Sequence, residues 1–282
     1  MNTIIRIALF SAFTSLFMAP GRMATANITP VDEAQCQNMK DHGTMPDTNP
    51  DTPDKDKPPV GCDRLRNVHF QYIDFKGNKH EGTLVVLDVI SESTQSIFDH
   101  LYAMRFPIAQ AMPMEHFDGD DDRAMEANNT SAFNGRRIAG STSWSKHAYG
   151  AAIDLNPLQN PVLYPSTNGT IAVKPLAATG TYINRLDARP GKAVRPGMAE
   201  QVIDLFAQHG FIRWGGYWDS PMDMQHFEVG TVNFVKTLAS KPLEQGKIIF
   251  EKYIEDYKKC ICEKKGEDKA RDRAECVEQL SN

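Results

Sequence analysis

The stretch SKHAYGAAID at residues 145–154 decides the fold that we expect for this chain, together with DMQHFE at residues 223–228. Between them they offer two imidazoles, from His147 and His226, and more than one carboxylate. Two imidazoles and one carboxylate form the ligand set of a catalytic zinc site that keeps a fourth position open for water. A spare carboxylate beside that water can take its proton and later pass it to a leaving group. The two stretches therefore predict a zinc centre whose parts come from distant places in the chain.

The residues between His147 and Asp154 indicate how the backbone runs past such a centre. Residues 150–152 are all small, and we expect them to let the backbone pass close under a metal ion. Ile153 and Leu155 flank Asp154 with apolar side chains. This alternation places Asp154 on the opposite face from its neighbours, at the end of a strand.

A lone histidine is more often an ordinary surface or core residue than a metal ligand, and this chain has eight. Six of them have no partner at ligand spacing, and we interpret them as ordinary residues. These are His42, His69, His80, His100, His116 and His209. The metal interpretation depends on His147 and His226 occurring together in their two motifs.

The two motifs resemble those of a known family of zinc metallopeptidases. The pattern Ser-x-His-x-x-Gly-x-Ala-x-Asp, followed downstream by Asp-x-x-His-Phe-Glu, is similar to VanY-like D-alanyl-D-alanine carboxypeptidases and to the L-alanyl-D-glutamate endopeptidases of phage lysins. The resemblance extends from Val68 to Val229. Besides the motifs it includes residues 106–108, 128–136, 154–161 and 210–218.

The resemblance implies a role for each matching residue. His147, Asp154 and His226 would hold one zinc ion per chain, and Asp223, three residues before His226, would serve as general base and acid. Arg136 would face the scissile carbonyl, although Arg137 follows it directly and the assignment could be off by one.

Two positions depart from the family pattern. Gly135 stands where close relatives often have Cys, which we expect to cost the mechanism nothing. Tyr217 stands where many relatives have Asp, which we expect to affect substrate preference. The implied fold is α+β, a small antiparallel sheet that carries the zinc ligands with helices packed against it, as in hedgehog and DD-peptidase domains.

The implied function is a zinc-dependent peptidase that hydrolyses peptide bonds in peptidoglycan stem peptides. The sequence leaves open whether it acts as a D-Ala-D-Ala carboxypeptidase or as an L-Ala-D-Glu endopeptidase. A carboxypeptidase needs a cation for the free carboxylate, and whether Arg137, Arg213 or another residue supplies it is not evident. The alternative is a non-catalytic zinc-containing module that binds the cell wall. Asp223 argues against that alternative, because a binding module needs no general base.

Composition limits the other classes of function. With 41% hydrophobic and 24% charged residues, the chain has the composition of a soluble globular protein. Its net charge is -5 and no basic stripe carries interleaved aromatics, which argues against nucleic acid as a partner. The sequence gives no indication of the oligomeric state.

Residues 1–26 resemble a secretory signal peptide, with a basic start, an apolar core and a small-x-small cleavage site. We therefore expect export to the periplasm, the cell envelope or the outside, with no stable membrane anchor after cleavage. Three further parts follow. We expect a polar Pro/Asp-rich linker at 27–63, the zinc peptidase domain at 64–235, and a charged helical tail at 236–282. The linker should have no core, and the tail should not be needed to make the site.

Five cysteines fit export, and none lies in the metal motifs. Cys36 and Cys62 could close the linker as a disulfide. One pair is plausible among Cys260, Cys262 and Cys276, which leaves one thiol over.

Within the domain, the sequence predicts a hairpin from strands at 68–75 and 83–89, a helix at 93–104 capped by Ser93, and a helix at 198–209. The acidic residues at 118–122 have part of the spacing of a calcium loop. The rest of that pattern fails, so a solvated loop is the preferred interpretation.

Overall fold

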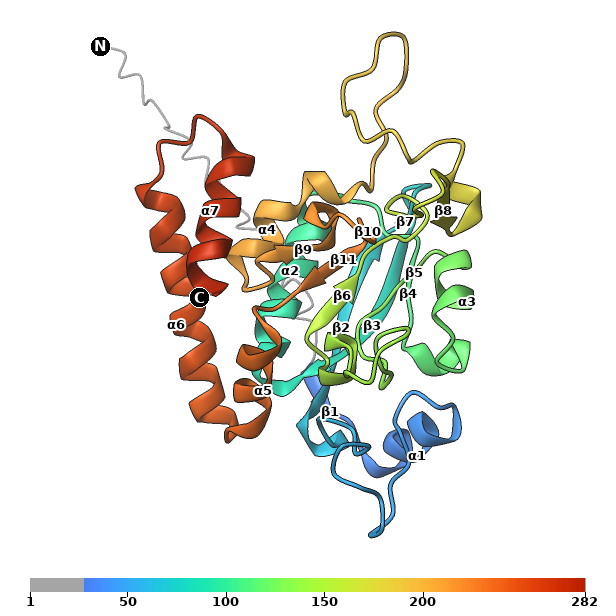
Figure 1. Cartoon of the computed structure of the whole chain (residues 1–282), viewed down its shortest axis with the longest axis vertical. Helices are drawn as coiled ribbons and strands as arrows, with labels where there is room; N and C mark the ends of the chain where they lie inside the picture. The colour runs from blue at the N-terminus through green and yellow to red at the C-terminus, as the bar shows by residue number, and fades with distance from the viewer. Residues whose placement is uncertain (1–27, 282) are drawn as a thin grey trace, which may run out of the picture.

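The computed structural model describes residues 28–281, so the predicted signal peptide lies outside the described residues. Within that range, no helix combines the length and the apolar character that a membrane span requires. Small sheets occupy the centre of the molecule (Figure 1). α1 (Glu33–Asp41) lies at its lower end and the C-terminal helices stand along one side.

A long hairpin forms the central framework. β2 (Leu65–Ile73) pairs antiparallel with β3 (Lys79–Leu87) along their full length. α2 (Ser91–Ala103) packs on the hairpin, where Phe98 stacks on Phe70 with their ring centroids 4.0 Å apart. The predicted hairpin and helix are therefore confirmed. The predicted Ser93 cap is wrong, because the helix starts two residues earlier and Ile90 occupies its N-cap.

Two small antiparallel sheets build the region of the two motifs. In the first, β11 (His226–Glu228) lies between β6 (Ala152–Asp154) and β9 (Arg213–Trp214). In the second, β7 (Val162–Pro165) lies between β10 (Met222–Asp223) and β8 (Ile171–Lys174). A short parallel pair, β4 (Gln110–Ala111) with β5 (Asn129–Thr130), lies beside them.

The predicted α+β class is confirmed, with one difference. We expected a single sheet to carry the site, but its residues are divided among several elements. Asp154 and His226 lie in one sheet and Asp223 in another, while His147 belongs to a 3-10 helix. The strands have two to four residues each, so each carries only part of a motif.

The remaining helices lie around these sheets (Figure 1). The helix predicted at 198–209 is shorter than expected, because it opens with a 3-10 turn and the α-helix ends before Gly210, whose φ is +92°. The bounds of the remaining α-helices are α3 (Asp121–Glu126), α4 (Ile203–Gln208), α5 (Val232–Ser240), α6 (Leu243–Glu263) and α7 (Lys269–Ser281).

Residues 28–63, which we call the N-terminal segment, are not a linker without a core. β1 (Ile28–Pro30) pairs with β2, α1 follows, and a disulfide joins Cys36 to Cys62. Val31, Met39, Met45 and Val60 are buried in the main core. The segment is polar on average, so its composition does not indicate these apolar residues. They pack on the core, and the disulfide closes the loop between them. The division into four parts stays a prediction, although the boundary at 235 falls inside α5.

α6 and α7, which we call the C-terminal hairpin, stand side by side on the domain (Figure 1). A disulfide between Cys260 and Cys276 joins them, and Cys262 is exposed and unpaired. The predicted single pair with one thiol left over is confirmed. The hairpin buries Phe250, Tyr253 and Tyr257 against the core.

Candidate metal centre

The first motif folds into a tight turn that leads into β6. A 3-10 helix covers Lys146–Tyr149, and the Ser145 hydroxyl caps it by accepting a hydrogen bond from the His147 amide at 3.2 Å. The turn ends at Gly150, whose φ is +65°. A Cβ atom there would lie 2.6 Å from the Leu87 nitrogen, so the glycine is required by close contact with β3. Gly150 therefore allows close packing on β3, and the expected passage of residues 150–152 under a metal ion stays a prediction.

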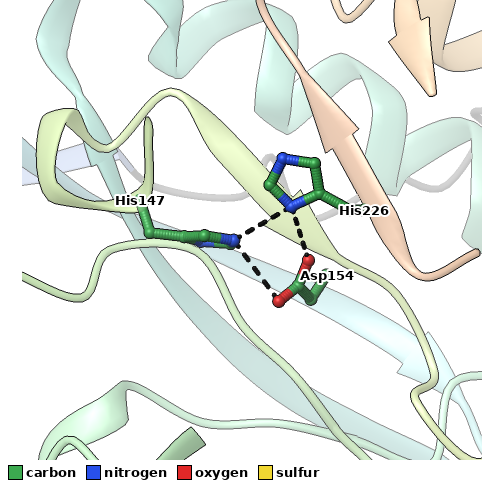
Figure 2. Close-up of side chains that lie close together, drawn as sticks. All are labelled: His147, Asp154 and His226. Carbon is green, nitrogen blue, oxygen red and sulfur yellow. Dashed lines mark hydrogen bonds and ion pairs between the residues drawn. The ribbon is translucent and has the colours of Figure 1, made fainter. Parts of the chain in front are cut away.

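The pairing of β6 with β11 sets Asp154 opposite His226, and the 3-10 helix brings His147 to the same place. Figure 2 shows the three side chains pointing toward one another. His147 Nε2 lies 3.2 Å from His226 Nδ1, and the Asp154 carboxylate lies 3.0 Å from His226 Nδ1 and 3.3 Å from His147 Nε2. Among the described residues, only these three form a metal-type group of three or more ligands.

The outer nitrogen of each imidazole is already bound to an acceptor. His147 Nδ1 donates to the Ala132 carbonyl at 2.5 Å, because a carbonyl oxygen can only accept. His226 Nε2 lies 3.0 Å from the Glu228 carboxylate. The inner nitrogens therefore present lone pairs to each other and to Asp154 when both rings are neutral. Lone pairs at these distances repel unless a cation or a proton stands between them, so the residues fit a metal ion.

The charges around His226 favour a positive charge at this place. Burial alone would lower the pKa of His226, but its contacts with Asp154 and Glu228 outweigh burial and raise that pKa to about 10. Burial would raise the pKa of Asp154, yet the two imidazoles hold it well below its usual range. A proton or a metal ion can supply the charge that the two carboxylates favour.

Asp223 stands beside this cluster on β10, which pairs with β7. Its Oδ1 atom is buried and has no hydrogen-bond partner among the described residues. Burial raises the pKa of Asp223, and the charge of Asp154 raises it further, to about 7. A carboxyl group that titrates near neutrality suits proton transfer. Gly215 allows the backbone of Asp223 to pack closely, since a Cβ atom at residue 215 would lie 2.5 Å from the Asp223 carbonyl oxygen.

The three clustered side chains and Asp223 line one cleft of about 570 Å³, which also contains Arg136. Arg136 forms an ion pair with Asp121 of α3. Arg137 binds Asp56 at 2.8 Å and stacks on Trp144, with its guanidinium 4.4 Å from the ring centroid. The two adjacent arginines therefore have different surroundings, and Arg136 is the one that lines the cleft.

A buried ion-pair network lies behind His226. Glu228 belongs to the second motif, but the sequence alone did not indicate its two cationic partners. Lys146 Nζ lies 2.8 Å and Arg213 Nε 3.0 Å from Glu228 Oε1. Burial would raise the pKa of Glu228, but His226 and Lys146 outweigh it and lower that pKa to about 2. A lysine inside the first motif was the available signal, since its charge needs a partner if the motif is buried.

The acidic residues at 118–122 are engaged with different partners. Asp118 pairs with His42 and Arg123, Asp121 with Arg136, and Asp122 with Lys174. Asp120 caps α3 by accepting from the Arg123 amide. Their carboxylates do not converge, which agrees with a solvated loop and not with a calcium site.

Comparisons with known proteins agree with this geometry. Residues 139–229 match the model of a family described as D-alanyl-D-alanine carboxypeptidase. The matched range contains both motifs, but not Arg136, the N-terminal segment or the C-terminal hairpin. No curated protein and no solved structure matches the chain significantly. The resemblance read from the two motifs is confirmed, and the segment that holds the converging side chains carries the pattern of the D-alanyl-D-alanine carboxypeptidase family.

Proposed function

We propose that this protein is a zinc-dependent peptidase that hydrolyses peptide bonds in peptidoglycan stem peptides. The observation that carries the proposal is the convergence of three electron-pair donors, from His147, Asp154 and His226, inside a cleft. The family match supports a peptidase, and its description supports stem peptides as the substrate class.

In this proposal His147, Asp154 and His226 hold one zinc ion, and each ligand is kept in place by the structure around it. When bound, zinc supplies the Lewis acidity that makes water a nucleophile near neutral pH. Asp223 takes a proton at its unpartnered Oδ1 and returns it to the leaving amine. Arg136 exchanges part of its pairing with Asp121 for the substrate carbonyl, which it can hold through two N–H donors.

The proposal includes export to the periplasm, the cell envelope or the outside. Two disulfides, Cys36–Cys62 and Cys260–Cys276, support it, because such bonds persist mainly in oxidising compartments. The signal-like residues 1–26 agree with export.

The bond that is cut can be identified by digesting purified peptidoglycan with the zinc-loaded protein and measuring the released fragments by mass. Free D-alanine identifies a carboxypeptidase, and fragments that begin with D-glutamate identify an endopeptidase. Asp223→Ala should lower turnover by about 10²-fold or more while zinc content stays at one per chain. Zinc binding without any cleavage by the natural protein would instead favour a cell-wall binding module. Loss of zinc from Asp223→Ala would contradict the role given to Asp223.

A further inference from the structure

The end of the C-terminal hairpin contacts the residues that hold His226. Ser281, in the last turn of α7, accepts a hydrogen bond from Arg213 Nη1 at 3.2 Å. The same guanidinium donates through Nε to Glu228, which lies against His226 Nε2. Three consecutive contacts therefore join α7 to a candidate metal ligand.

A second contact reaches the site from the middle of α7. Arg273 binds Asp204 at 2.7 Å and the Tyr217 hydroxyl at 3.1 Å. Tyr217 packs edge-on against Trp214, with ring centroids 5.1 Å apart. The next residue, Trp218, lies against the His226 ring at 5.2 Å. Arg273 thereby fixes the turn that contains Tyr217 and Trp218, and Trp218 contacts the candidate ligand His226.

The disulfide determines whether α7 can make these contacts. α7 is strongly charged and buries little beyond Cys276, whose exposed fraction is 0%. The bond from Cys276 to Cys260 ties α7 to α6, which is anchored by its own buried aromatic residues. Without that bond, few apolar contacts would hold α7 near Arg213.

We propose that α7, held by the Cys260–Cys276 disulfide, is a positioning element of the metal centre. It keeps Arg213 on Glu228, and Glu228 keeps the His226 ring in the orientation that presents Nδ1 to Asp154 and His147. This inference rests on the proposed function for the metal, and it replaces our expectation that the tail is not needed to make the site. Arg213 and Ser281 are positioning residues, since neither touches the three converging atoms.

The N-terminal disulfide provides a matched control. It closes 26 residues where the C-terminal one closes 16, so both variants lose a comparable constraint on the unfolded chain. No hydrogen bond or ion pair of the described residues links Cys36 or Cys62 to Glu228. If the C-terminal disulfide only stabilised the fold, removing either disulfide would have the same effect on zinc affinity and on the His226 ring.

The experiment measures zinc affinity by competition with a chromophoric chelator, at a temperature where circular dichroism shows every variant folded. Removing a contact behind a metal ligand typically costs 10–100-fold in affinity. We expect a loss of about tenfold for Arg213→Gln and for Cys260→Ser with Cys276→Ser, and a smaller loss for Ser281→Ala. Cys36→Ser with Cys62→Ser should keep the affinity of the natural protein. Equal affinity in all variants, or an equal loss in both disulfide variants, would overturn the proposal.

A second measurement separates this inference from the proposed function. In the metal-free protein, the ring ¹⁵N signals of His226 report its tautomer and its bond to Glu228. We expect these signals to shift in the C-terminal disulfide variant and to stay unchanged in the N-terminal one. If the natural protein binds no zinc, the proposed function fails, while these signals still test whether α7 orients His226. Unshifted signals in the C-terminal variant would count against the positioning role.

Discussion

The N-terminal segment and the C-terminal hairpin are each closed by one disulfide, but they support different residues of the cleft. Each lies outside the range that matches the carboxypeptidase family. The N-terminal segment holds the loop that carries Arg136, because Thr44 O accepts from the Gly135 amide at 2.7 Å. The C-terminal hairpin reaches His226 through Arg213. One part thus supports the side assigned to substrate, and the other supports the side assigned to metal.

The residue at 135 shows how closely the N-terminal segment fits. A Cβ atom on Gly135 would lie 2.5 Å from both Pro46 Cδ and Thr44 O. The Cys that the family resemblance leads us to expect at this position would therefore collide with the N-terminal segment.

Of the changes that compare the two sides, the largest effect should come from the arginine on the substrate side. Arg136→Ala should lower kcat/KM by about 10²-fold, because it removes a charged donor from the place where the carbonyl would lie, and it should leave zinc affinity unchanged. Arg137→Ala is the matched control, since Arg137 binds Asp56 and Trp144 instead, and we expect less than about a tenfold change from it. A larger loss from Arg137→Ala than from Arg136→Ala would show that the assignment is off by one.

Much of the site could be predicted from its motifs, because local sequence sets the turn at Gly150 and the strand that ends in Asp154. The meeting of His147 with His226 was inferred from family resemblance, since nothing local links positions 79 residues apart. The contact between Arg213 and Ser281 could not be predicted. Their contact joins residues 68 apart and depends on how α7 docks, which periodicity does not encode.

The N-terminal segment was misjudged for a related reason. Its low average hydrophobicity predicts an extended chain, whereas four apolar side chains and one disulfide dock it. Composition measures how much apolar surface a segment has, but not whether that surface fits a hollow of the core.

The next effect concerns the stability that the two disulfides provide. Removing either one should lower the free energy of unfolding by about 3 kcal/mol, with the longer N-terminal loop costing slightly more. Their kinetic effects should differ. Cys36→Ser with Cys62→Ser should raise KM, because the Arg136 loop loosens, whereas the C-terminal pair should mainly weaken zinc. Urea unfolding measures the loss of stability, and steady-state kinetics at saturating zinc measure KM. If only the C-terminal variant had a raised KM, the C-terminal hairpin and not the N-terminal segment would support the substrate side.

Gly135→Ala tests the N-terminal contact without touching a disulfide. The added methyl group meets backbone and a proline ring, so we expect a loss of about 2 kcal/mol in the free energy of unfolding. Gly180→Ala is the control, since a Cβ atom there meets nothing within 4 Å, and it should change stability by less than about 0.5 kcal/mol. Urea unfolding of both variants decides the point. Equal stabilities would mean that the segment shifts freely away from the loop.

The smallest effect is a dependence of the free energy of unfolding on pH, which arises from His209 near α6 of the C-terminal hairpin. Burial lowers the pKa of His209, and the nearby His100 and Lys258 lower it further, while its bond to the Leu205 carbonyl works in the other direction. The folded protein therefore keeps this ring neutral at a pH where the unfolded chain already binds a proton. Stability should fall as the pH drops below about 6.5, the pKa of an unperturbed histidine, because the unfolded state then takes up more protons. His209→Gln, which can still bond Ser96, should flatten this fall between pH 7.5 and 5.5 in urea unfolding. The same slope in both proteins would show that the acid sensitivity arises from groups other than His209.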